Sequence, residues 1–164
     1  MLKFAKRLGE LNFGALMEVY EEGNLENGAL RYPNLPENEQ LLRAREDFYA
    51  YLKDHFFPEP GAVCAVWEEN GRYVSALRLE PYEDGLLLEA LETAPGARGR
   101  GYAKQLVMAV LSTLGSQTVY SHVSKKNAAS LAVHKACGFQ RISEHAAYID
   151  GSVSANACTL RWKG

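Results

Sequence analysis

The feature that most restricts the possible folds is a glycine-rich basic turn between a strand-like and a helix-like segment. Residues 86–93 have the composition of a buried strand, and residues 102–114 place apolar side chains at helical spacing. The turn between them runs from Arg98 to Gly101 with the sequence RGRG. Glycine permits backbone conformations and close ligand approach that a Cβ would prevent. A strand, a tight turn and a helix in this order favour a fold that mixes both element types.

The same turn has the chemistry of an anion-binding site. The first turn of a helix leaves backbone N–H groups unpaired and carries a partial positive charge, and phosphate oxygens commonly bind there. Arg98, Arg100 and Lys104 add cationic donors, and a guanidinium can bind one phosphate through two parallel hydrogen bonds. The sequence therefore predicts a pyrophosphate-binding turn. The alternative, an ordinary tight turn with solvated arginines, would give the same short pattern.

Length and composition limit the class of protein. A chain of 164 residues fits a single domain, which we expect to span residues 1–164. The net charge of −2 argues against nucleic acid as a partner. No apolar run is long enough to cross a bilayer, so we expect no membrane partner. Three cysteines without a CxxC pair, and an N-terminus without a long apolar stretch, favour the cytoplasm. We expect no metal site.

The N-terminal third of the chain predicts two helices separated by a loop. Residues 7–21 place apolar side chains on one helical face, and Gly23 is expected to end this helix. Residues 23–38 have the asparagine, glycine and proline residues typical of a loop. A second helix is predicted over residues 38–55, with Asn38 as its N-cap.

The rest of the chain predicts a sheet with further helices. Residues 69–71 (ENG) are a strong hairpin signal, and a helical crossover makes strand 118–123 parallel to strand 86–93. Asn127 is expected to cap the helix that follows. The predicted strands are residues 2–5, 62–68, 72–80, 86–93 and 118–123, the later helices are 102–114 and 127–137, and a closing hairpin joins 142–149 to 156–162 through a turn at 150–152. This order predicts an α+β (α/β/α) fold with a mixed, mostly antiparallel sheet.

Two spaced motifs resemble the GNAT superfamily of acyl-CoA-dependent N-acyltransferases. The family's turn has Gln or Arg, any two residues, Gly, any residue, and Gly or Ala, which matches Arg98 to Ala103. Further along, the family has a strand, an Asn, a short helix and a Gly-Phe pair. The matching residues are 119–123, Asn127, 128–136 and Gly138 with Phe139. The resemblance covers residues 62–162 and implies a GNAT-like sheet in which two parallel strands splay apart.

The resemblance implies that acetyl-CoA, or a close acyl-CoA, is the co-substrate. Its pyrophosphate would lie on the amides of residues 100–104, and its pantetheine arm would pair with the strand backbone near Leu91 and Thr93. Asn127 would bond to that arm from the other side, unless it acts only as a helix cap. The implied cofactor-binding residues are Leu91, Thr93, Arg98, Gly99, Arg100, Gly101, Tyr102, Ala103, Lys104 and Asn127.

The implied reaction is direct attack of an amine on the thioester in a ternary complex. An amine like that of lysine, with a pKa of about 10.4, must lose a proton at pH 7, and the departing thiolate must gain one. A backbone N–H on strand 86–93 is expected to bind the thioester carbonyl oxygen. Many relatives use a Tyr as the acid, four residues before the Gly of the Gly-Phe pair, where this chain has His134. His134 is therefore the candidate acid; the alternative is a histidine that only fills space.

Glu89, Glu92 and His122 are the candidate bases. Glu89 and Glu92 lie on the strand that resembles the family's cofactor strand, and regular alternation would place them on opposite faces. His122 occupies a position where some relatives that acetylate protein N-termini carry a Glu, and Tyr120 shares its face. We favour Glu92 and His122. If all three are ordinary sheet residues, water would carry the proton instead.

The acceptor is left open by the sequence. In the family it is shaped by segments that correspond to residues 23–37 and 144–157, and acidic side chains in the first would suit a cationic amine, although surface glutamates are usually only solvated. A small amine, an amino acid, an antibiotic and a peptide or protein N-terminus are all compatible with the sequence, as is a homodimer. Two other classes compete: a non-catalytic acyl-CoA-binding or sensing module, and a nucleotide-binding domain, which the missing opening β-α-β unit disfavours.

Overall fold

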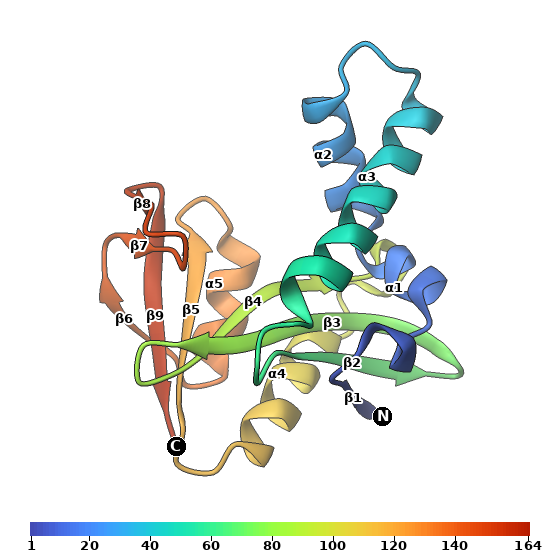
Figure 1. Ribbon diagram of the computed structural model, residues 1–164. Coiled ribbons are helices and arrows are strands. Elements are labelled where there is room, and N and C mark those ends of the chain that lie inside the picture. Colours follow the sequence, from blue (N-terminus) through green and yellow to red (C-terminus); the bar gives the residue numbers. More distant parts are fainter.

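A seven-stranded sheet crosses the molecule, with its strands in the order β1-β2-β3-β4-β5-β9-β6 (Figure 1). The computed structural model describes residues 1–164. The strands are β1 (Leu2–Ala5), β2 (Val63–Glu69), β3 (Arg72–Tyr82), β4 (Gly85–Thr93), β5 (Thr118–Ser124), β9 (Ala157–Lys163) and β6 (Gln140–Ser143). All neighbours are antiparallel except β4 and β5. The predicted mixed α+β sheet, the meander β2-β3-β4 and the parallel pair are confirmed.

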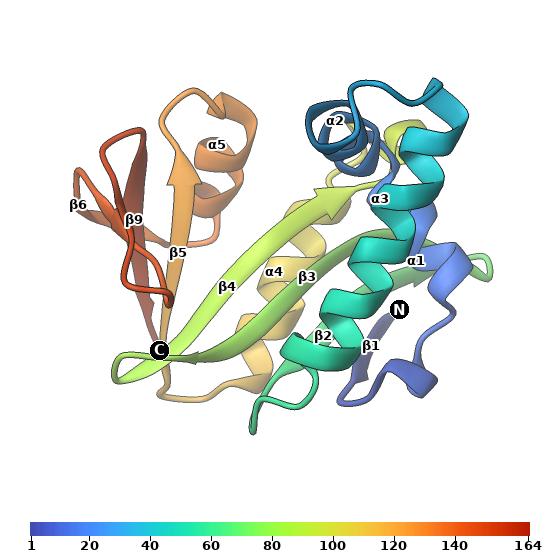
Figure 2. The same cartoon turned by 45° about the horizontal axis from the view of Figure 1, so that its top comes forward.

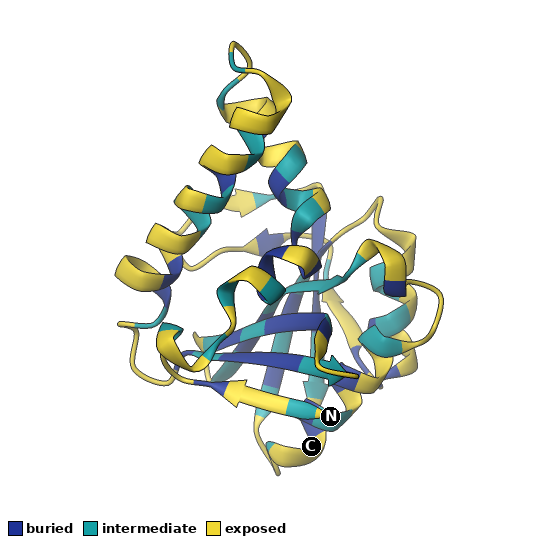
Figure 3. Cartoon of the chain, turned by 90° about the vertical axis from the view of Figure 1, so that its right-hand side faces the viewer, coloured by how far each residue is buried: buried dark blue, intermediate teal, exposed yellow.

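Helices cover both faces of this sheet (Figures 1 and 2). One face carries α1 (Phe13–Val19), α2 (Glu21–Arg31) and α3 (Glu37–Tyr51), and the other carries α4 (Tyr102–Thr113) and α5 (Ala128–Ala136). Each face has its own buried cluster. Leu106, Val107, Val110 and Leu111 of α4 pack on one side of the sheet, and Leu16, Leu52 and Phe56 pack on the other. In Figure 3 the centre of the sheet is dark blue, whereas the far end of the α2–α3 pair is exposed.

Strands β4 and β5 are paired only at their beginnings. The parallel register joins Leu86–Leu88 to Val119–Ser121 and ends there, and Figure 2 shows the two strands diverging beyond that point. A β-bulge in β4 lies just past the last pair: Arg78 faces Glu89 and Ala76 faces Glu92, so Leu77 opposes two residues. Bulges bend a strand and increase its twist. The bulge therefore turns β4 away from β5 and opens the sheet.

The N-terminal helices differ from the sequence-based expectation. The predicted helix over residues 7–21 begins only at Phe13, where Asn12 Oδ1 accepts a hydrogen bond from Ala15 N (3.0 Å). The predicted loop over residues 23–38 is wrong over its first part, because α2 continues through Gly23 to Arg31, and only residues 32–36 form a loop before α3. Asn38 is not an N-cap, since α3 begins at Glu37 with Pro36 in that position. A π-helical turn over 52–56, closed by Phe57 N and Leu52 O (3.0 Å), then ends the second predicted helix.

Gly28 explains why glycines in this segment do not indicate a loop. A Cβ built on Gly28 would lie 2.5 Å from the Gln40 carbonyl oxygen, whereas one on Gly23 would have nothing within 4 Å. Gly28 is therefore the point where the backbones of α2 and α3 approach closely. The close contact between the two helices that a glycine permits outweighs the low helix propensity of glycine.

We expect Gly28→Ala to lower the free energy of unfolding by about 1–3 kcal/mol, because the added methyl group must push α2 and α3 apart. The matched control is Gly23→Ala on the same helix, which should raise stability by about 0.5–1 kcal/mol because its Cβ meets open space. Urea unfolding of the two variants measures both effects. Equal stabilisation by the two alanines would contradict the close approach at Gly28.

The C-terminal hairpin is also rearranged. The expected pairing of residues 142–149 with 156–162 is replaced by two smaller ladders: β6 pairs with β9, and β7 (Ala146–Ala147) pairs with β8 (Val153–Ser154). The chain leaves the main sheet after Ser143 and returns at Ala157, so that β9 lies between β5 and β6. The expected turn at Asp150 is present, with Asp150 Oδ1 accepting from Ser152 N (2.8 Å). None of the helices is both long and apolar enough to span a membrane.

Candidate functional site

A cleft of about 700 Å³ lies where β4 and β5 separate. Four segments line it: part of α2, the end of β4, the glycine turn with the start of α4, and the start of α5. Its walls thus come from both faces of the sheet. The lining residues from the two helices that face each other across the opening are Glu22, Gly23 and Glu26 of α2 and Asn127, Ala129, Ser130 and Val133 at α5.

The predicted cofactor-binding residues gather at this cleft. The lining includes Leu91, Thr93, Arg98, Gly99, Gly101, Tyr102, Ala103, Lys104 and Asn127, and leaves out only Arg100. Gly99 and Gly101 have φ values of 75° and 79°, a region that other residues rarely adopt. A Cβ at either glycine would meet nothing within 4 Å, so backbone conformation is what requires glycine here. Helix α4 begins directly afterwards, at Tyr102, with its N–H groups at the cleft.

Arg98 is held by contacts within the protein. Its guanidinium pairs with Glu22 of α2, and its Nε donates to the Thr93 carbonyl oxygen (3.4 Å). The side chain therefore ties α2 to the end of β4 across the glycine turn. Lys104 also lines the cleft and makes no ion pair within the protein. It is thus the cation at this turn that is available to an anionic ligand.

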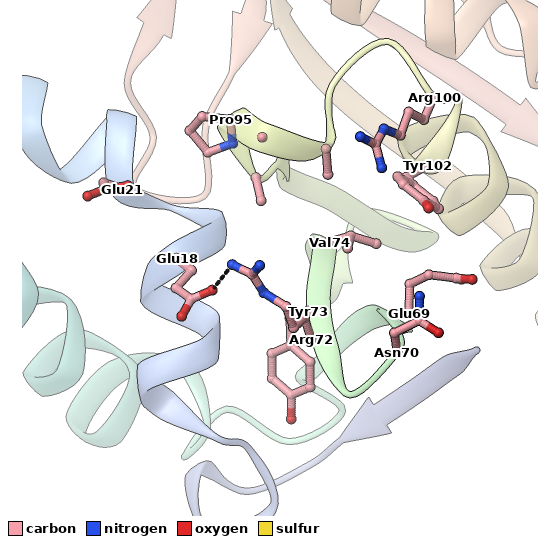
Figure 4. A pocket seen from close by; sticks show the side chains of 13 residues that line it. Glu18, Glu21, Glu69, Asn70, Arg72, Tyr73, Val74, Pro95, Arg100 and Tyr102 are labelled. Carbon is pink, nitrogen blue, oxygen red and sulfur yellow. Dashed lines mark hydrogen bonds and ion pairs between the residues drawn. The ribbon is translucent and has the colours of Figure 1, made fainter.

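Arg100 points into a neighbouring cavity of about 430 Å³ (Figure 4). This cavity is bounded by the end of α1, the β2–β3 turn and residues 94–97. Arg72 and Glu18 form an ion pair across it (2.9 Å), and Tyr102 lies beside Arg100. Arg100 therefore contributes only its backbone to the glycine turn, whereas the sequence suggested that its side chain would also be a cationic donor there. Its guanidinium is directed away from the larger cleft.

The bulge places Glu89 and Glu92 on the same face of the sheet, which corrects the expectation of opposite faces. Their partners Arg78 and Ala76 are two residues apart on β3 and so share a face. The extra residue between the two glutamates cancels the change of side that regular alternation would give. Ala90, inside the bulge, has φ of 52°. Both carboxylates thus lie on the side covered by α1–α3.

The two carboxylates nevertheless have different surroundings. Glu89 Oε1 accepts from Arg78 Nε (3.2 Å), and the Arg78 guanidinium lies 5.1–5.6 Å from the ring centres of Phe48, Tyr51 and Phe56. Glu89 therefore serves as the counter-ion of a largely covered arginine and does not line the cleft. Glu92 does line it, and its carboxylate makes no ion pair.

The surroundings of Glu92 raise the pKa of its carboxyl group. Burial is the main cause that raises the pKa of Glu92; Arg98 lowers this pKa, while the carboxylates of Glu22 and Glu26 raise it. A half-buried carboxyl group with a raised pKa is a stronger base than an exposed one. The same three carboxylates make this end of the cleft attractive to a cation.

His134 lies on the buried face of α5 and not in the cleft. It is 1% exposed, its ring packs edge-on against Phe139 (5.0 Å between ring centres), and it is absent from the cleft lining. Its Nδ1 is 2.7 Å from the Ser130 carbonyl oxygen. Because a carbonyl only accepts, Nδ1 carries the proton and the buried Nε2, which has no partner, carries a lone pair. Burial lowers the pKa of His134, although the Ser130 bond opposes this. A neutral ring with this tautomer has no free proton to donate.

We expect His134→Leu to leave kcat within about threefold of the wild-type value while lowering stability by about 1 kcal/mol through loss of the Ser130 bond. The pKa of His134 is lowered from 6.5 in the folded state. The unfolded state therefore binds more protons below pH 6.5, and stability is lost as the pH falls through that value towards the folded pKa. The variant should lose this part of the pH dependence. Urea unfolding between pH 5 and 8, with steady-state assays, measures both; a large fall in kcat would restore His134 as the acid.

His122 lies at the point where the parallel strands part. It follows Ser121, the last residue of β5 that pairs with β4. Its ring contacts those of Tyr82 and Tyr148 (5.3 and 5.1 Å between centres), and both ring nitrogens are buried without a partner. Burial lowers the pKa of His122, which keeps the ring neutral near pH 7. Tyr120 shares its face but donates its hydroxyl to Asp84, so it is engaged elsewhere.

Two groups of contacts near the divergence of β4 and β5 could not be predicted from the sequence. The aromatic group around His122 comes from β3, β5 and the β7–β8 hairpin, and no local pattern brings those segments together. Tyr20 connects α1 to α2 and donates its hydroxyl to the Ala90 carbonyl oxygen in the bulge (2.7 Å). No group of three or more His, Cys, Asp or Glu side chains is arranged to hold a metal ion.

Comparison with known proteins agrees with the fold described above. The family model described as Acetyltransferase (GNAT) family matches residues 25–139, whereas no curated protein sequence matches. Among solved structures, PaiA N-acetyltransferase from Thermoplasma acidophilum, in complex with coenzyme A, superposes with a TM-score of 0.64 at 13% identity over 100% of this chain and 99% of that one. The ribosomal-protein-alanine N-acetyltransferase from Brucella melitensis gives 0.63 at 19% identity over 100% and 99%. The ribosomal-protein-S18-alanine N-acetyltransferase from Escherichia coli gives 0.59 at 15% over 99% and 94%.

Proposed function

Because the chain belongs to the GNAT family of acetyltransferases, we propose that it transfers the acetyl group of acetyl-CoA to a primary amine by direct attack in a ternary complex. Acetyl-CoA is the acyl donor of this family. The observation that carries the proposal is the cleft at the divergence of β4 and β5, with a left-handed glycine turn at one end and the unpaired Glu92 carboxylate in its wall. The three cysteines are buried and form no disulfide, in keeping with a site of action in the cytoplasm.

The residues at the turn fit a diphosphate. Gly99 and Gly101 shape a loop without Cβ atoms, the N-terminus of the twelve-residue helix α4 follows it, and Lys104 supplies an unpaired cation. The pantetheine arm would run along β4 at Leu91 and Thr93, where β5 no longer pairs with β4. Asn127 Oδ1 accepts from Ser130 N (3.0 Å), which confirms the predicted cap. Its side-chain NH2 remains available to donate to the arm.

We assign Glu92 as the base that takes the proton from the acceptor amine. The amine nitrogen then bonds to the thioester carbonyl carbon, the carbon–sulfur bond breaks, and the electron pair leaves with sulfur. The Leu91 N–H, next to Glu92 on β4, is proposed to bind the carbonyl oxygen as charge develops there. The attached nitrogen then releases its second proton to water, and with His134 out of reach the thiolate would receive the first proton from Glu92 through water. His122 is the second candidate base, because it is neutral and faces the same side of the sheet.

The acceptor is proposed to be a cationic amine. Glu22, Glu26 and Glu92 all line the cleft, and only Glu22 has a counter-ion, Arg98. A cation entering from the α2 side would relieve the mutual repulsion of these carboxylates. Both a small molecule and a peptide N-terminus satisfy this condition.

Release of free thiol tests the function directly. Purified protein with acetyl-CoA and a library of primary amines should release CoA thiol with at least one cationic amine and with no neutral alcohol. A thermal-shift panel should show stabilisation by acetyl-CoA and CoA and none by NAD or ATP. Stabilisation by acetyl-CoA without thiol release from any amine would favour the alternative of a non-catalytic acyl-CoA sensor. Absence of stabilisation would reject both.

A further inference from the structure

The β4 bulge is held by one hydrogen bond from outside the sheet. Ala90 has φ of 52°, a backbone conformation that is costly for a residue with a Cβ. Its carbonyl oxygen accepts the hydroxyl proton of Tyr20 at 2.7 Å. Tyr20 is 6% exposed, and its ring lies 5.1 Å from that of Phe48. A packed ring therefore presents the hydroxyl to a strained peptide at a fixed position.

The direction of this bond fixes the neighbouring amide. No peptide bond in the chain is cis, and in a planar trans peptide the C=O and N–H point in opposite directions. Since the Ala90 carbonyl is directed at Tyr20, the Leu91 N–H points away from Tyr20 and from the α1–α3 face. Leu91 lines the cleft. The orientation of this single peptide group thus decides where the Leu91 N–H points.

We propose that Tyr20 is a positioning residue for catalysis, whose hydroxyl holds the Ala90–Leu91 peptide so that the Leu91 N–H is aimed at the thioester carbonyl oxygen. The inference rests on the proposed function and extends it to a residue on a different element. Burial raises the pKa of Tyr20 far above its usual range, so the phenol keeps its proton and remains a donor throughout the working pH range. Tyr20 also connects α1 to α2, so the bulge is tied to the helix that carries Glu22 and Glu26.

Tyr20→Phe removes only the hydroxyl and provides the test. We expect kcat to fall about tenfold, because a misaimed donor loses part of its transition-state contact, while the KM for acetyl-CoA stays within about twofold. The matched control is Tyr73→Phe, which removes a hydroxyl from the same buried cluster; Tyr73 is 8% exposed and its oxygen accepts from Asn12 N (3.2 Å). Tyr73→Phe should retain full kcat. Equal losses in both variants, or no loss in Tyr20→Phe, would overturn the proposal.

A binding measurement separates this inference from the proposed function. CoA lacks the acetyl carbonyl, so calorimetry on wild-type protein should give tighter binding of acetyl-CoA than of CoA. Tyr20→Phe should bind CoA as the wild type does and lose the preference for acetyl-CoA. A preserved preference rejects the role of Tyr20 alone, whereas wild-type protein that binds neither ligand rejects the transferase function and this inference with it.

A structure of the wild-type complex with acetyl-CoA checks the same point without any variant. The carbonyl oxygen is expected within about 3 Å of Leu91 N. A thioester bound to a different donor would overturn the proposal even if Tyr20→Phe failed to fold.

Discussion

Replacing Glu92 with Gln is expected to lower kcat about 100-fold, the scale of a lost general base, with little change in acetyl-CoA binding. The amide has nearly the same shape and cannot accept a proton. Because the pKa of Glu92 is raised by burial and by Glu22 and Glu26, the wild-type rate should fall as the pH decreases through a value above the usual 4.3 of a glutamate. Steady-state kinetics across pH 5–9 should show that this acidic limb disappears in Glu92→Gln.

The control for this experiment is Glu26→Gln, which removes a carboxylate that lines the same cleft but is not assigned to proton transfer. It should raise the KM for a cationic acceptor and keep an acidic limb, shifted to lower pH because the Glu26 carboxylate helps to raise the pKa of Glu92. If Glu92→Gln keeps the limb and a His122→Asn variant loses it, His122 is the base. A limb that survives in both would leave proton transfer to water.

Replacing Gly101 with Val is expected to weaken acetyl-CoA binding at least 100-fold, a loss of about 2.7 kcal/mol. Gly101 has φ of 79° and immediately precedes α4, so a β-branched residue there must distort the turn. The distortion moves the first N–H groups of α4, which are proposed to hold the diphosphate. Isothermal calorimetry with acetyl-CoA, together with the ligand-induced rise in Tm, measures the loss.

Gly96→Ala is the matched control, because Gly96 precedes the same turn, does not have positive φ, and would place its Cβ in open space. Gly96 lines the smaller cavity and not the cleft. It should bind acetyl-CoA like the wild type. Circular dichroism of the ligand-free variants establishes that both are folded. Undiminished binding by folded Gly101→Val would remove the turn from the cofactor site.

The sequence was most informative where a short segment sets its own conformation. Asn127 capped the predicted helix because an Asn side chain can reach an N–H three residues ahead without help from the rest of the chain. The ENG turn produced a hairpin for the same local reason. Gly23 and Gly28 misled the prediction, because glycine also occurs where two helices touch, and only the position of Gln40 reveals that contact at Gly28.

In the candidate site, too, the features set by a short segment could be predicted, and the features set by distant neighbours could not. The glycine turn could be located because positive φ restricts residue type at Gly99 and Gly101. The tautomer of His134 and the direction of the Arg100 side chain could not be predicted, since both depend on neighbours. Whether Glu89 and Glu92 lie on the same face depends on the bulge. The sequence of β4 does not indicate this bulge, because Ala90 is not a residue type that marks one.

The sequence by itself determined the order of strands and helices from β2 to α5, the parallel pair and the position of the glycine turn, because these follow from backbone preferences over a few adjacent residues and from the helical crossover. The tertiary structure alone decided which side chains reach the opening between β4 and β5. That outcome depends on a one-residue bulge held by Tyr20 from the α1–α3 side of the sheet and on the approach of α2 to the turn through Arg98 and Glu22. Contacts between residues about seventy positions apart in the chain produce no periodic pattern in the sequence from which they could be predicted.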